Sequence, residues 1–134
     1  MSTPPSELKV ITSAKNLNKY LFKMLENAPK KYRGTIIARL ENASLSVVES
    51  LVRANLIPLG EKRRSEEQRE AKVQLKMIDM YAQLAIDMDC LSYHQGEVIG
   101  KMLGETSSLL LAWMKNDERR LKNDSSGSGS QKEG

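Results

Sequence analysis

Helical periodicity over residues 35–57 constrains the fold of this chain most strongly. Apolar side chains recur there at intervals of three and four, which places them along one side of an α-helix. This row contains Ile36, Ile37, Leu40, Ala43, Val47, Val48, Leu51 and Ala54. A second apolar row lies beside it and contains Leu45, Val52 and Leu56. Because so broad an apolar surface must contact more than one neighbour, the sequence predicts that this helix lies at the centre of a helical bundle.

Three further segments, residues 7–27, 66–88 and 93–115, show the same periodicity. The segment 66–88 also has two apolar rows. One contains Val73, Met77, Met80, Tyr81, Leu84 and Met88, and the other contains Ala71, Leu75, Ile78, Ala82 and Ala85. The predicted core row of 93–115 contains Ile99, Met102, Leu103, Thr106, Leu109, Leu110 and Trp113.

Helix-start signals precede all four segments, and Ser6 is a candidate N-cap for the helix 7–27. Ser65 and Ser92 each stand three residues before a glutamine, the pattern of a capping box. Thr35 is a candidate N-cap for the helix 35–57. No strand pattern is visible, and the connections between helices are short. We therefore predict an all-α protein, an up-down-up-down antiparallel four-helix bundle.

The length of 134 residues suits one domain, and we assign residues 1–122 to the bundle. Residues 123–134 are rich in Gly and Ser and are expected to form a flexible tail outside the fold. The single cysteine, Cys90, excludes an intrachain disulfide and is expected to be a small buried residue. No basic-then-apolar leader and no apolar run of about 20 residues is present, so a cytoplasmic location without membrane contact is expected.

The residues do not indicate an enzyme. His94 is the only histidine, and it has no partner at the spacing of a metal site or a general base. Neither a phosphate-binding glycine loop nor a Gly-x-Ser-x-Gly elbow is present. We therefore expect no catalytic residue, no metal site and no cofactor.

Basic residues are the first candidate functional feature. The formal net charge is +4, and residues 1–58 hold nine Lys and Arg against four Asp and Glu. Such cations attract phosphates with salt-sensitive, largely sequence-independent affinity. The alternative is a basic face that only water contacts. The candidate nucleic-acid-binding residues are Lys15, Lys19, Lys23, Lys30, Lys31, Arg33, Arg39, Arg53, Lys62, Arg63, Arg64 and Lys101.

A row of small residues is the second candidate feature. Gly96, Gly100, Gly104 and Ser108 recur every four residues within the predicted helix 93–115. Each glycine inside a helix costs about 1 kcal/mol relative to alanine, so close approach of another backbone is expected to offset that cost. The approaching helix belongs either to the same bundle or to another subunit, and the sequence leaves both open.

Four short motifs carry a family resemblance that extends over about residues 8–115. They are APKKYRG at 28–34, ARLENASLSVVESLV at 38–52, DCLS at 89–92 and IGKMLG at 99–104. These segments resemble the four-helix-bundle family of proteins encoded in intervening sequences of ribosomal RNA. The same family includes the accessory variability determinant, Avd, of diversity-generating retroelements. The intervening-sequence branch carries a proline and an Asn-Ile-Ala-Glu-Gly signature where this chain has Val48 and residues 50–54, SLVRA, which favours the Avd-like branch.

The resemblance implies a non-enzymatic accessory protein. Members of the Avd branch form pentamers with a basic surface, and they bind a reverse transcriptase and its template RNA during mutagenic complementary-DNA synthesis. The implied partners are therefore a reverse transcriptase, RNA or an RNA/DNA hybrid, and further copies of the chain. The alternatives are a helical scaffold that binds only proteins, and an intervening-sequence-type bundle without a reverse-transcriptase role.

Overall fold

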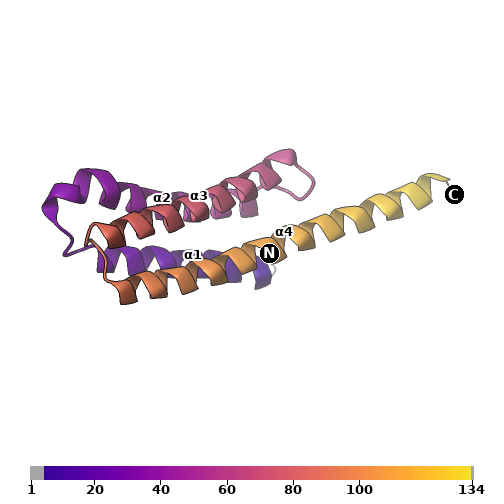
Figure 1. The fold of residues 1–134 in the computed structure, drawn as a ribbon. Helices are drawn as coiled ribbons and strands as arrows, with labels where there is room; N and C mark the ends of the chain where they lie inside the picture. Colours follow the sequence, from indigo (N-terminus) through magenta and orange to yellow (C-terminus); the bar gives the residue numbers. More distant parts are fainter. Residues whose placement is uncertain (1–4, 134) are drawn as a thin grey trace.

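The computed structural model describes residues 5–133, with side-chain environments for residues 9–124. This part of the chain contains four α-helices and no strand. The helices are α1 (Pro5–Met24), α2 (Ala38–Leu56), α3 (Lys62–Asp87) and α4 (Tyr93–Glu133). Both α1 and α3 pack against α2 and α4 (Figure 1). The α1–α2 and α3–α4 links lie at one end of the molecule, and the α2–α3 link lies at the other. The predicted all-α class is confirmed.

The core consists of the main apolar row of each helix, as the periodicity predicts. Leu17, Leu40, Ile78 and Leu110 represent these rows, and each is at most 1% exposed. Trp113 is the largest buried side chain and is fully enclosed near the α2–α3 link. The predicted core row of residues 93–115 is confirmed at its central positions, since Ile99, Leu103 and Thr106 are also buried.

The predicted burial of the second apolar rows is wrong for most of their side chains, although Met77 and Tyr81 of α3 are half-buried and Tyr81 packs against the core. Leu56 of α2 is 77% exposed, and Leu45 and Val52 are exposed as well. On α3 the exposed members are Val73, Met80, Leu84 and Met88. The contact between α1 and α2 also includes a polar pair, in which Asn18 Nδ2 donates to Ser44 Oγ at 2.8 Å. Each helix packs mainly against two of the other three and keeps an outward side, so α2 is not a central helix.

The starts of α2 and α3 also differ from the prediction. The chain enters α2 through a 3₁₀ turn, Lys30–Tyr32, and a π turn, Arg33–Ile37, so the α-helix begins at Ala38 rather than at residue 35. Thr35 does not cap it, because its hydroxyl donates to the Tyr32 carbonyl at 3.3 Å.

One predicted capping box is correct and the other is not. The Ser92 amide donates to Gln95 Oε1 at 2.8 Å, and the Gln95 amide donates to Ser92 Oγ at 3.1 Å. Helix α3, in contrast, begins at Lys62 rather than at residue 66. The Ser65 hydroxyl lies inside its first turn and donates to the Lys62 carbonyl at 3.0 Å.

Helix α4 continues well past the predicted end, at residue 115 or slightly beyond, and projects past the other three helices (Figure 1). The last buried side chain among those described is Asp117, and residues 118–124 are exposed. The backbone is helical up to Glu133, where the composition predicts an irregular tail. Extension of an existing helix adds a backbone hydrogen bond per residue without a new nucleation step. No helix in the described part of the chain has the length and apolar character needed to cross a bilayer.

Candidate nucleic-acid interface

Helix α1 presents a ridge of three lysines. Lys15, Lys19 and Lys23 follow each other at intervals of four, so they lie on one side of the helix. All three are exposed, whereas Leu17 and Leu21 on the opposite side are buried. None of the three lysines forms an ion pair with a described residue.

The α1–α2 link adds further exposed cations at the end of this ridge. Pro29 precedes the 3₁₀ turn and holds the extended backbone from which that turn begins. Lys31 Nζ lies 5.1 Å from the centre of the Tyr32 ring, which packs against the core. The turn is thereby attached to the bundle while Lys30 and Arg33 stay exposed.

We call seven residues the α1–link cations: Lys15, Lys19, Lys23, Lys30, Lys31, Arg33 and Arg39. Arg39 joins the set because it is exposed in the first turn of α2. No carboxylate in the described part of the chain pairs with any of them. Their charges are therefore available to an anionic partner.

Three of the predicted site cations near the α2–α3 link, in contrast, are paired with carboxylates. Arg53 Nε lies 2.8 Å from Glu67 Oε2, a hydrogen bond that raises the pKa of Arg53. The other two pairs are Lys62 with Glu66 at 3.8 Å and Arg63 with Glu61 at 3.7 Å. These neighbouring carboxylates weaken the attraction of this end for phosphate.

Arg64 is buried, which corrects its assignment to the phosphate-binding surface. Its guanidinium donates to both carboxylate oxygens of Asp117, at 2.8 and 3.0 Å, and to the Ile57 carbonyl at 3.1 Å. Gln68 Nε2 donates to the same carboxylate at 2.9 Å, and the guanidinium carbon lies 5.3 Å from the Trp113 ring centre. We call Arg64, Gln68 and Asp117 the buried clamp, which joins the start of α3 to α4.

The buried clamp has a signal in the sequence. Arg64 and Gln68 continue the buried row Ala71, Leu75 and Ile78 toward the N-terminus at helical intervals. Asp117 continues the row of α4 one turn beyond Trp113. Opposite charges that extend two core rows therefore indicate a buried ion pair.

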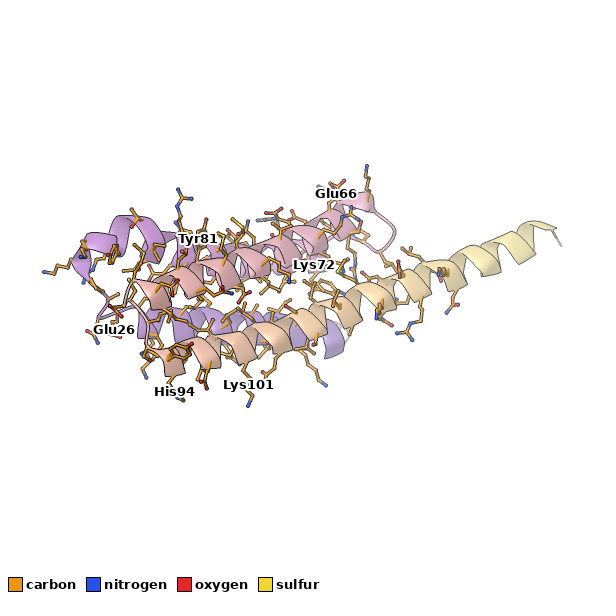
Figure 2. The ribbon with its side chains drawn as sticks, in the orientation of Figure 1. Glu26, Glu66, Lys72, Tyr81, His94 and Lys101 are labelled. Carbon is orange, nitrogen blue, oxygen red and sulfur yellow. The ribbon has the colours of Figure 1, made fainter. Side chains whose placement is uncertain are left out.

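The remaining predicted site residues lie on α4. Lys101 is exposed, forms no ion pair with a described residue and points away from the bundle (Figure 2). At Gly96 the close neighbour is a side chain rather than the predicted backbone, because an added Cβ atom would overlap the Ile86 side chain of α3. At Gly100 and Gly104 an added Cβ has no described atom within 4 Å, so the described part of the chain shows no close packing there. Ser108 is exposed.

His94 and Cys90, the only histidine and the only cysteine, differ in their exposure. His94 is exposed in the first turn of α4, on the side that points away from the bundle (Figure 2). Cys90 is buried as predicted, and burial raises the pKa of its thiol, with Asp89 adding to the effect and Lys31 opposing it. No group of three or more metal-ligating side chains occurs within the described residues.

Comparisons with known proteins do not identify a family. No protein-family model matches the chain, and no curated protein matches it either.

Proposed function

We propose that the chain is a non-enzymatic, nucleic-acid-binding accessory protein. The observation that carries this proposal is the set of seven α1–link cations on α1, the α1–α2 link and the start of α2. The α1–link cations are exposed and have no described carboxylate partner, whereas Arg53, Lys62 and Arg63 at the other end are paired. Binding through them follows backbone phosphates rather than base sequence, because lysine and arginine on an exposed ridge contact phosphates without reading base edges.

The resemblance in the four short motifs supports a more specific role within this proposal. In that role, the chain serves a diversity-generating retroelement and binds its reverse transcriptase and template RNA, or an RNA/DNA hybrid, during mutagenic complementary-DNA synthesis. The proposed protomer is an up-down-up-down antiparallel bundle, and the proposed assembly is a cytoplasmic homopentamer. The exposed apolar side chains of α2 and α3, such as Leu45 and Val73, offer area for contacts between copies.

A protein-binding scaffold is the second candidate function, and the same exposed apolar side chains favour it. Light scattering of the purified chain with a structured RNA, at low and at raised salt, separates the two functions. Formation of a complex that dissociates as salt rises supports nucleic-acid binding. A mass that RNA does not change at any salt concentration contradicts it and favours the scaffold. The mass of the chain alone tests the pentamer separately.

A further inference from the structure

The surface between α3 and α4 contains a groove that the nucleic-acid proposal does not use. It consists of two adjoining hollows, of about 330 and 350 Å³, which share Leu111 as a lining residue. The first lies beside Gly100 and Gly104, and the second extends to Leu121 beyond the buried clamp. At 1.5 Å per residue, the span from Gly100 to Leu121 is about 30 Å, the length of a helix of about 20 residues.

The lining of the groove is apolar along its base. Leu75, Leu103 and Leu110 are buried core residues that also line the first hollow. Leu111 and Leu121 are each 41% exposed, so part of the groove offers apolar area to a partner. An apolar base of this kind favours aliphatic side chains over a phosphate backbone.

Two glycines keep the first hollow open. A Cβ atom at Gly100 or Gly104 has nothing within 4 Å, so the packing of this chain does not require glycine at either position. Gly96 differs, because Ile86 fills the space beside it. No packing contact among the described residues offsets the helix-propensity cost at the two open positions. Side chains of a bound helix can enter the space that the two glycines leave.

The charged side chains that line the groove indicate the chemistry of its partner. Lys72 and Lys76 line the first hollow, and Arg69 and Lys115 line the second. None of the four forms an ion pair with a described residue. The carboxylates beside them are Asp79 in the first hollow and Glu61, Asp117 and Glu118 in the second. Asp117 is bound by Arg64 and Glu61 is paired with Arg63, so the open charges of the groove are predominantly positive.

We propose that the α3–α4 groove binds an acidic amphipathic helix of a partner protein. Leucine-like side chains of that helix enter beside Gly100 and Gly104 and pack on the apolar base. Its carboxylates pair with Lys72 and Lys76 on the α3 side of the groove. This is the helix-in-groove mode of recognition, on a surface distinct from the α1–link cations, and it does not depend on nucleic-acid binding.

The test uses a synthetic peptide of about 20 residues, with leucine at helical intervals of three and four and glutamate on both flanks. Backbone amide NMR signals of the isotope-labelled full chain are followed during titration. We expect the signals of Gly100 and Gly104 to shift and those of α1 to stay unchanged. A control peptide with lysine in place of glutamate is expected to cause no shift. Equal binding of the two peptides, or shifts confined to other helices, overturns the proposal.

Two pairs of charge reversals supply matched controls. The groove variant Lys72→Glu/Lys76→Glu is expected to weaken peptide binding at least tenfold and to leave RNA binding nearly unchanged. The α1 variant Lys15→Glu/Lys19→Glu, with the same change in net charge, is expected to do the opposite. Loss of RNA binding in the groove variant, together with unchanged peptide binding, overturns the proposal and assigns the groove to nucleic acid.

Filling the groove tests the same idea without changing charge. Gly104→Leu places a side chain in the first hollow and is expected to raise the melting temperature, because leucine favours helix over glycine. We expect this variant to lose peptide binding while it remains folded. A stable variant that still binds the acidic peptide contradicts the proposal. A lower oligomeric mass of the variant assigns the groove to contacts between copies and also contradicts it.

Discussion

Arg64 and Asp117, 53 positions apart in the sequence, form a bidentate ion pair inside the bundle. Each side chain is only 8% exposed, and the pair lies beside the ring of Trp113. Gln68 supplies a further hydrogen bond to the carboxylate, and the Ile57 carbonyl accepts one from the guanidinium. The pair therefore connects the α2–α3 link and the start of α3 to the part of α4 where its burial ends.

Removal of one partner from this pair is expected to be strongly destabilising. Asp117→Ala leaves the Arg64 guanidinium buried without its carboxylate, so we expect a loss of about 3–5 kcal/mol in the free energy of unfolding. The double variant Arg64→Met/Asp117→Leu removes both charges and is expected to lose much less. Urea denaturation followed by circular dichroism measures both. A single variant as stable as the parent chain contradicts a buried, mutually dependent pair.

The two serines of the predicted capping boxes are expected to behave differently. Ser92→Ala removes the hydroxyl that accepts the Gln95 amide proton at the start of α4, so we expect a loss of about 1 kcal/mol. Ser65→Ala removes only a hydroxyl that donates back within the first turn of α3, and we expect a change of a few tenths of a kcal/mol. Comparison of the two unfolding midpoints in urea checks this. Equal losses of unfolding free energy in the two variants would contradict this difference and assign a capping role to Ser65.

Alanine substitutions at two glycines of α4 are expected to change stability in opposite directions. Gly104→Ala meets nothing within 4 Å and removes the helix-propensity cost, so we expect stabilisation by up to about 1 kcal/mol. Gly96→Ala places a methyl group against Ile86 and is expected to destabilise the bundle. Differential scanning calorimetry of the two variants measures the shifts in opposite directions. A lower melting temperature for Gly104→Ala indicates that an unseen backbone lies against that position.

Cys90 gives a prediction for alkaline pH. Burial raises the pKa of its thiol above the unfolded value of about 8.5, so the native state favours the protonated form. The resulting contribution to stability is complete below the unfolded pKa and is lost as pH rises through the folded pKa. Above about pH 8.5, the parent chain is expected to lose stability more steeply than Cys90→Ala. Urea midpoints measured across this pH range test it, and parallel pH profiles of the two proteins contradict it.

The main apolar rows and the all-α fold could be predicted because helical spacing is a local property of the sequence. Leu40 and Ile78 lie on rows whose period alone identifies a buried face. The burial of the second rows could not be predicted in this way. Spacing shows that Val52 and Met80 each share a side of their helix with other apolar residues. It does not show whether a neighbouring helix covers that side. The position of a neighbour depends on all four helices together.

The candidate site was predictable only in part, for a related reason. Each cation can be identified from the sequence, but its partner cannot. Arg63 and Arg64 are adjacent in the sequence. Arg63 is exposed and lies near Glu61, whereas Arg64 is buried and paired with Asp117. The turn of the helix separates them by about 100°, so only one of them lies on the core row. The free state of Lys15 and the paired state of Arg53 likewise depend on which helix packs alongside.

We expect RNA affinity to depend on where the unpaired cations lie and not on net charge. Two triple variants, each with three fewer positive charges, test it directly by RNA binding across a range of salt concentrations. We expect Lys30→Gln/Lys31→Gln/Arg33→Gln to weaken binding strongly and to reduce the salt slope by about 2–3. The control Arg53→Gln/Lys62→Gln/Arg63→Gln is expected to change both only slightly. Equal losses in the two variants would contradict the claim.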